Sequence, residues 1–241
     1  MNVEQLLDGL SAKDIKALAR AISVVENEAE GYLELLERIP VYPIPVIGIT
    51  GPPGSGKSSI LNSIVNHPSS EGKSICILAV DPSSPFNLGS ILGDRIRMNK
   101  FHKDRQIYFR SLASRGSLGG LSEKIIEVLE IAKSINFDLI LIETVGVGQS
   151  EVEVAGLADT TVVVLTPESG DHVQSMKAGL MEIADIFVVN KCDHPNAKSF
   201  VKSLEQVLAI SKEKPPVVEM TATKDKGVVE LLDQIKIAHH K

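Results

Sequence analysis

The sequence has few cysteines and no long hydrophobic runs. Its two cysteines, Cys76 and Cys192, are too few for the disulfide framework of a small secreted domain. The longest apolar runs extend over about six residues, as at 75–80. A helix that crosses a bilayer needs about 20, so no membrane span is expected. The amino terminus also lacks the basic and apolar blocks of a signal peptide and the arginines of a transit sequence, and we therefore expect a cytoplasmic protein.

An excess of positive charge is missing as well. Lysine and arginine together number 25 against 31 acidic residues, which gives a formal net charge of −6. Nucleic-acid backbones attract basic surfaces, so this balance argues against a generic nucleic-acid-binding protein. The sequence contains no internal repeat and no low-complexity tract, and its 241 residues suffice for an α/β domain with an ample core.

The first 40 residues are expected to form a helical arm. Leucines and isoleucines recur there at spacings of three and four, the period of an amphipathic helix. Ser11, three residues before Asp14, resembles a capping box with Asp in place of Glu, so two helices are expected to meet there. Three prolines between positions 40 and 45 then indicate a linker, and we predict a helical arm at 1–40 followed by a second domain at 41–241.

From residue 46 onward, short apolar segments typical of buried strands alternate with helical segments. The segments lie near 46–50, 74–80, 106–110, 138–143, 161–166, 185–190 and 217–221. This alternation predicts an α/β fold with a mostly parallel sheet flanked by helices on both faces. In such folds ligands bind at the carboxyl ends of the strands, so functional residues are expected there.

A phosphate-binding loop follows the first of these strands. Residues 51–58 fit the pattern G-x-x-x-x-G-K-[ST], in which glycines let backbone N–H groups converge on phosphate oxygens. A helix that begins near Lys57 would add the positive end of its dipole to the same anion site. We expect Lys57 to contact the β and γ phosphates and Ser58 to bind Mg²⁺ through its hydroxyl. The loop and first helical residues are Gly51, Pro52, Pro53, Gly54, Ser55, Gly56, Lys57, Ser58 and Ser59.

A base-reading element, N-K-x-D, ends the strand near 185–190. Asp193 can accept hydrogen bonds from both the N1–H and the N2 amine of guanine, whereas adenine offers neither group, so the predicted nucleotide is GTP rather than ATP. Asn190 is expected to tie this loop to the phosphate loop, and the Lys191 stem to cover the base. Farther along, a backbone amide within Thr221, Ala222 and Thr223 is expected to meet the guanine carbonyl.

Two carboxylates end strands beside the phosphate loop. Glu143 closes the strand near 138–143, at a position where most GTPases carry the Asp of D-x-x-G. Asp81 ends the strand near 74–80. Acidic oxygens beside one phosphate site favour a role in holding Mg²⁺ and positioning water. Gly146 is expected to direct its N–H toward the γ phosphate, so that the stretch after it rearranges when that phosphate leaves.

Four further motifs stand out, E-T-V-G-V-G-Q-S-E at 143–151, D-P-S-S at 81–84, G-S-I-L-G-D at 89–94 and G-S-L-G-G-L at 116–121, of which the first is the most specific. Together they resemble a known family, the MeaB/ArgK-type P-loop GTPases, also known as LAO/AO transport ATPase-like proteins, which serve cobalamin-dependent acyl-CoA mutases. The resemblance covers about residues 14–238. It implies a P-loop NTPase fold of the SIMIBI class, Mg²⁺-dependent GTP hydrolysis, and control of cofactor loading or protection in a mutase partner.

The resemblance also implies roles for individual residues. Asp94 would join Asp81 and Glu143 around Mg²⁺ and its waters. Residues 170–177 would match the segment that reports the nucleotide state to the mutase, and Lys177 at its end is a candidate to approach the nucleotide. The family forms homodimers through a helical arm after its G domain, and this sequence ends at Lys241, so dimerisation by that mode is left open.

Two other functions remain open alternatives. A GTPase that inserts nickel during hydrogenase or urease maturation shares the fold, but that class carries Cys and His ligands in its switch segments, and 144–151 contains neither. A phosphotransferase of the old ArgK type would need a segment that binds the acceptor, and none is apparent. A chaperone for a mutase is therefore the favoured interpretation, with no nucleic-acid or membrane partner expected.

Overall fold

The computed structural model describes residues 2–81, 107–113, 124–144, 154–167, 178–210 and 214–239. Within them, seven parallel strands form one sheet in the order β3-β2-β4-β1-β5-β6-β7. The strands are β1 (Val46–Thr50), β2 (Ile75–Asp81), β3 (Ile107–Ala113), β4 (Leu139–Thr144), β5 (Thr160–Leu165), β6 (Ile186–Val189) and β7 (Val217–Glu219). The predicted strands are therefore confirmed, with ends that shift by three residues at most.

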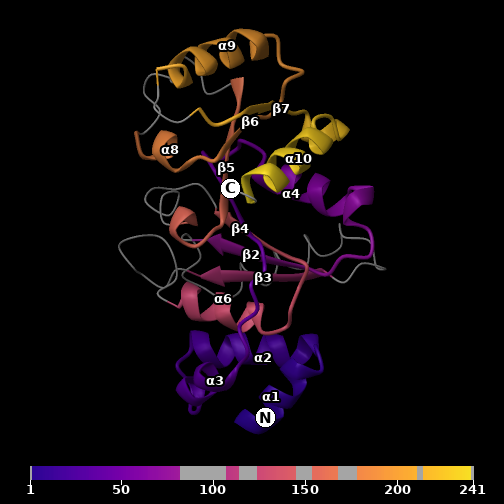
Figure 1. Cartoon of the computed structure of the whole chain (residues 1–241), viewed down its shortest axis with the longest axis vertical. Coiled ribbons are helices and arrows are strands. Elements are labelled where there is room, and N and C mark those ends of the chain that lie inside the picture. Colours follow the sequence, from indigo (N-terminus) through magenta and orange to yellow (C-terminus); the bar gives the residue numbers. More distant parts are fainter. Residues whose placement is uncertain are drawn as a thin grey trace.

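Helices cover the sheet and gather at its two ends (Figure 1). The three N-terminal helices lie at one end of the molecule next to α6, and α9 lies at the opposite end. The helices are α1 (Val3–Ser11), α2 (Ile15–Glu26), α3 (Tyr32–Arg38), α4 (Lys57–Asn66), α6 (Ile125–Lys133), α8 (Ala178–Ile183), α9 (Ala197–Leu208) and α10 (Val228–His239), with short 3-10 turns η1 (Pro68–Ser70), η2 (Val154–Gly156) and η4 (Ala222–Lys224).

The two faces of the sheet bury alternate residues of each strand. In β2, Cys76, Leu78 and Val80 pack with α6 and the N-terminal helices, whereas Ile75 and Ile77 pack with α4 and α10. This is the period of two that an extended chain imposes. A third cluster joins β5 and β6 to α8 and α9. The α/β fold with helices on both faces of a parallel sheet is confirmed.

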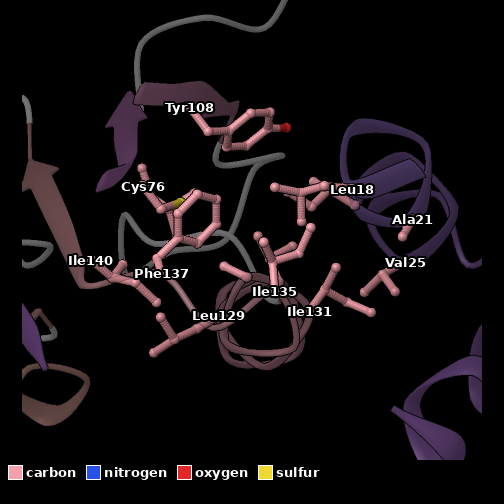
Figure 2. Packing of buried hydrophobic residues seen from close by; sticks show 14 of the residues in the cluster. Leu18, Ala21, Val25, Cys76, Tyr108, Leu129, Ile131, Ile135, Phe137 and Ile140 are labelled. Atoms are coloured by element: carbon pink, nitrogen blue, oxygen red, sulfur yellow. The ribbon is translucent and has the colours of Figure 1, made fainter. Parts of the chain in front are cut away.

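The N-terminal arm packs against the rest of the chain rather than standing apart. Figure 2 shows Leu18, Ala21 and Val25 of α2 facing Ile131 of α6, with Phe137 close by. All five side chains belong to one buried cluster that also includes residues of the sheet. This packing gives the arm and the sheet a common core. The division of the chain into an arm at 1–40 and a domain at 41–241 stays a prediction.

The start of α2 corrects one sequence-based expectation. Ser11 does not cap a helix, because it is the last residue of α1. Asp14 is instead the N-cap of α2, and its carboxylate accepts from the amide of Lys16 at 2.8 Å. The two helices do meet at this point, as predicted, and Lys13 between them adopts a positive φ of 57°.

Three aspartates hold the amino ends of neighbouring strands together, and we name these contacts the amino-edge clamps. Each aspartate precedes a strand, accepts the amide N–H of a residue at the start of the adjacent strand, and donates its own amide to that residue's carbonyl. The pairs are Asp138 with Ser74 (2.7 and 2.9 Å), Asp159 with Val46 (2.8 and 2.8 Å), and Asp185 with Thr161 (2.7 and 3.0 Å). The opposite edge of the sheet is where the predicted site residues lie.

In the part of the chain that the structure describes, no helix has both the length and the apolar character needed to cross a membrane. Both cysteines are free, Cys76 buried in β2 and Cys192 partly buried in the loop after β6.

Candidate nucleotide site

The predicted site residues that the structure describes lie at the carboxyl ends of β2, β4, β1, β6 and β7, with β5 between β1 and β6. The phosphate loop links β1 to α4, and β4 beside it ends with Glu143 and Thr144. On the far side of β5, Asn190 follows β6 and Thr221 follows shortly after β7. The strand order therefore places the phosphate-binding motif near the middle of the sheet and the base-reading motif toward the β7 edge.

Two glycines of the phosphate loop are required by close contacts. Gly51 has φ of 135°, and a Cβ there would lie 2.2 Å from the Val164 carbonyl oxygen of β5. Gly56 has φ of 91°, and a Cβ there would lie 2.2 Å from the amide nitrogen of the Asn190 side chain. Any larger residue would displace either β5 or Asn190, because L residues are strained at such φ values and the space is occupied.

The loop places one buried cation and one unpaired hydroxyl at its centre. Lys57, the first residue of α4, is only 6% exposed, and its Nζ donates to the carbonyls of Gly51 (2.7 Å) and Pro52 (3.0 Å). Ser55 is 1% exposed, and its Oγ has no hydrogen-bond partner among the described residues. A buried cation, an unpaired hydroxyl and the amino end of a ten-residue helix fit the oxygens of a phosphate group.

Hard oxygen ligands converge beside this loop. The Ser58 hydroxyl donates a short hydrogen bond to the carboxylate of Glu143, which is buried. The hydroxyls of Thr50 and Thr144, at the ends of β1 and β4, share a hydrogen bond of 2.9 Å. Asp81 ends β2 one strand farther along, where Val80 is in register with Thr144. Hydroxyl and carboxylate oxygens of this kind suit Mg²⁺, so Ser58 and Glu143 could hold that ion.

Asn190 connects the phosphate loop to the base-reading half of the site. Its side chain is buried, with Nδ2 donating to the Ser55 carbonyl at 2.9 Å and Oδ1 accepting from the Ala222 amide at 3.1 Å. The predicted tie to the phosphate loop is thus present in the structure. The second bond, to the loop after β7, was not foreseen, because nothing in the tetrapeptide N-K-x-D specifies which loop lies on its other side.

Asp193 projects from the same loop and is paired with a cation. Its Oδ2 lies 2.8 Å from Nζ of Lys224, in the loop after β7, and both side chains are about half exposed. The hydrogen bond from Lys224 holds the pKa of the Asp193 carboxyl below its usual value, so the group is a carboxylate at neutral pH. Lys191, next to it, has φ of 60°, a left-handed conformation that turns the chain sharply between Asn190 and Asp193.

The loop after β7 carries the triplet of residues 221–223. The Thr221 amide donates to the Lys226 carbonyl at 3.1 Å, and the Ala222 amide donates to the side chain of Asn190. Thr223 is the second residue of η4, and amides in the first turn of a helix have no partner within that helix. Its N–H is therefore a candidate to meet a base carbonyl.

Other predicted residues lie outside the described residues or are only partly described. Asp94, Gly146, Lys177 and the whole segment 168–177 fall outside the described part of the chain. The backbone of Asp81 is described as the last residue of β2. The Lys224 ion pair, like the bond from Asn190 to Ala222, had no signal in the sequence.

Comparison with known proteins bears on this geometry. Residues 18–241 match the family described as "Methylmalonyl Co-A mutase-associated GTPase MeaB". A Pyrococcus abyssi protein named as a GTPase is 43% identical over 245 residues, covering 97% of this chain and 75% of that protein. GTPase ArgK of Escherichia coli is 36% identical over 228 residues, covering 89% and 69%. The mouse protein named methylmalonic aciduria type A homolog, mitochondrial, is 33% identical over 263 residues, covering 99% and 63%.

Solved structures give the same answer for the fold. The crystal structure of a LAO/AO transport system kinase aligns with a TM-score of 0.77 at 26% identity, covering 99% of this chain and 77% of that one. The hydrogenase maturation factor HypB from Archaeoglobus fulgidus aligns at 0.62 with 21% identity, covering 91% and 99%, a likeness of fold alone. The motif-bearing loops, the parallel sheet and the match over residues 18–241 agree, and the chain belongs to the MeaB family of P-loop GTPases.

Proposed function

We propose that this chain binds Mg²⁺·GTP along the carboxyl edge of its sheet and uses the nucleotide state to act as a chaperone for a cobalamin-dependent acyl-CoA mutase. The observation that carries the nucleotide assignment is the Asn190 side chain. It bonds to the phosphate loop through Ser55 and to the loop after β7 through Ala222. A single molecule with phosphates at one end and a base at the other would fit the two loops that Asn190 joins.

The base end selects guanine through Asp193. Its carboxylate, ionised at neutral pH, can accept both the N1 and the N2 hydrogens of guanine, whereas adenine presents an acceptor at N1 and no amine at C2. The Thr223 amide N–H would donate to the guanine carbonyl, and the aliphatic stem of Lys191 would cover the base. A base that lacks one or both of these hydrogens makes fewer hydrogen bonds to the charged carboxylate, and this difference favours guanine.

The phosphate end binds and positions the reacting group. Lys57 would exchange its two carbonyl contacts for the β and γ phosphates, joined by the Ser55 hydroxyl and the loop amides. Ser58, Glu143 and Asp81 would hold Mg²⁺ together with Asp94, and the ion when bound supplies charge neutralisation for phosphoryl transfer. Glu143 orients water through its carboxylate, and Gly146 and Lys177 are the proposed contacts from the neighbouring segments.

The partner assignment rests on the relatives. The family description names methylmalonyl-CoA mutase, and the mouse relative is named for methylmalonic aciduria. Together with the E-T-V-G-V-G-Q-S-E motif of the sequence, these names support a mutase that uses cobalamin as the partner of this chain. The proposed task is to control loading of that cofactor or to protect it.

The test is GTP hydrolysis by the purified chain, measured alone and with a purified cobalamin-dependent acyl-CoA mutase. We expect slow hydrolysis alone, stimulation by the mutase, and capture of the mutase on the immobilised chain with a non-hydrolysable GTP analogue. A Lys57→Ala variant is the control, because it should lose tight nucleotide binding and therefore both responses.

Other outcomes would redirect the assignment. Stimulation by a nickel-dependent hydrogenase or urease maturation system, with no response to the mutase, would indicate nickel insertion instead. Transfer of the γ-phosphoryl group to an acceptor rather than release of inorganic phosphate would indicate a phosphotransferase.

A further inference from the structure

The ion pair between Lys224 and Asp193 spans two loops that the nucleotide assignment places on either side of the base. Nζ of Lys224 lies 2.8 Å from Oδ2 of Asp193, and the two residues are 31 positions apart in sequence. Exposed ion pairs often contribute little, because two flexible side chains must be held in one geometry. This pair differs in that the backbone on both sides is held in place.

The backbone that carries Lys224 is fixed at several points. Thr221 and Lys226 exchange two backbone hydrogen bonds, at 3.1 and 3.3 Å, which close the loop between them. The Ala222 carbonyl accepts from the buried Ser63 hydroxyl of α4 at 2.9 Å. At Gly227, φ is 83° and a Cβ would lie 2.2 Å from the Glu219 carbonyl oxygen, so the end of the loop is packed against β7.

The backbone near Asp193 is held against the loop after β7, which carries Lys224. The Cys192 amide donates to the Met220 carbonyl at 2.9 Å, and the Cys192 thiol lies 3.1 Å from the Val189 carbonyl. Asn190 adds its bond to Ala222. Both halves of the ion pair therefore start from loops that are tied to each other independently of the pair itself.

We infer that Lys224 is a positioning residue for guanine selectivity, which holds the Asp193 carboxylate in the orientation that accepts both hydrogens of the base. A carboxylate has about four lone-pair sites, two on each oxygen. Guanine would take one on each oxygen, which leaves room on Oδ2 for Lys224. The cation therefore restrains rotation of the carboxylate without competing for the base. This inference rests on the proposed reading of guanine by Asp193.

The test compares GDP with IDP, whose base lacks the N2 amine and so offers Asp193 one hydrogen instead of two. We expect Lys224→Met to weaken GDP binding about twofold to fivefold, the range of an exposed ion pair held in good geometry. IDP and ADP binding should change less, so the ratio of GDP to IDP affinity should fall. Lys224→Arg should restore that ratio. Lys236→Met, which removes an exposed lysine paired with Asp233 on α10, is the matched control and should leave both affinities unchanged.

A second variant separates the inference from the assignment on which it rests. Asp193→Asn should exchange preference from GDP to XDP, whose base has a carbonyl in place of the amine, and in that background Lys224→Met should have no further effect. If Asp193→Asn gains no XDP affinity, the reading of the base by Asp193 is wrong. If Asp193→Asn does gain XDP affinity, two results for Lys224→Met would overturn the inference. Tighter GDP binding would show that Lys224 competes with the base, and an equal loss of GDP and IDP affinity would show that it supports the loop in general. Isothermal calorimetry gives all of these affinities.

Discussion

The Asn190 side chain joins two loops of the site, whose bonded residues Ser55 and Ala222 are far apart in the sequence. A buried amide that bonds on both sides is costly to remove, because the Ser55 carbonyl and the Ala222 N–H would each lose a partner. The same bonds require glycine at position 56, because a Cβ there would occupy the space of the Asn190 amide nitrogen. The residues of the phosphate motif and of the base-reading motif are therefore mutually dependent.

Asn190→Ala is expected to destabilise the fold by about 1–3 kcal/mol, the cost of leaving buried hydrogen-bonding groups unpaired. GDP affinity should fall as well, because the two loops lose their link. Urea unfolding and calorimetry measure the two effects. Asn196→Ala, an exposed asparagine before α9 that makes no side-chain capping bond, should change neither. Unchanged GDP affinity in Asn190→Ala would show that the loops are aligned by other contacts.

Glu143→Gln separates binding from chemistry. Glutamine preserves the shape of the buried side chain and can still accept from Ser58, but it lacks the charge that Mg²⁺ and an oriented water require. We expect GDP binding to stay close to the original value and Mg²⁺-dependent GTP turnover to fall on the order of 100-fold. Single-turnover hydrolysis is the measurement, with the exposed Glu205→Gln of α9 as control. Equal turnover in both variants would remove Glu143 from the mechanism.

At the scale of the elements, the sequence predicted the strands better than the contacts between their ends. The strand from Val46 to Thr50 and the helix beginning at Lys57 were found at the expected positions, because apolar runs and the glycine motif are local signals. The sequence indicated Ser11 as a capping residue, whereas the N-cap of α2 is Asp14. A side chain that can cap a helix does so only where the backbone turns. The Lys224 pair could not be predicted, since it depends on how two distant loops align.

The amino-edge clamps also had no obvious signal in the sequence. Their aspartates simply precede strands, as in F-D at 137–138, A-D at 158–159 and A-D at 184–185. Only the register of the sheet reveals that each carboxylate reaches the adjacent strand. The clamps satisfy amides that would otherwise be left at the open end of the ladder.

Asp138 makes the clamp between β2 and β4 sensitive to acid. Hydrogen bonds from the Ser74 hydroxyl and amide lower the pKa of Asp138 below its usual 3.8. A depressed pKa in the folded state means that the stabilisation is fully present above 3.8 and is lost as pH falls through the lower, folded value. The difference in unfolding free energy between the natural chain and Asp138→Asn should therefore shrink below that pH. Urea titrations on both sides of it test this, with Asp8→Asn on the exposed face of α1 as control; a constant difference would contradict the clamp.

At the scale of the whole molecule, the N-terminal helices and the sheet share one buried cluster and further ion pairs. Arg110 of β3 lies 2.5 Å from Glu26 at the end of α2, and Lys124 lies 2.8 Å from Glu28 and 5.3 Å from the ring centre of Tyr32. Packing and ion pairs therefore join the arm to the rest of the chain, and the arm lies at the opposite end of the molecule from α9 (Figure 1).

Leu18→Ala is expected to cost about 2–5 kcal/mol, because a fully buried leucine leaves a cavity when it is truncated. The unfolding should remain a single transition if the arm and the sheet share a core. Nucleotide selectivity should be unaffected, since the buried cluster that contains Leu18 includes no residue of the phosphate motif. Leu33→Ala, at a side chain 60% exposed on α3, is the control and should cost little. Two separate transitions in the Leu18 variant would favour an arm that folds on its own.

The amino-edge clamps also bear on how this protein could be made more robust. Stabilising changes often reduce activity when they stiffen the groups that do the chemistry. Here the clamped edge and the nucleotide edge are opposite ends of the same strands, so substitutions that tighten the start of β1, β2 or β5 would act at a distance from the reacting groups. The amino edge of the sheet is therefore the place to engineer heat resistance without a loss of catalytic activity.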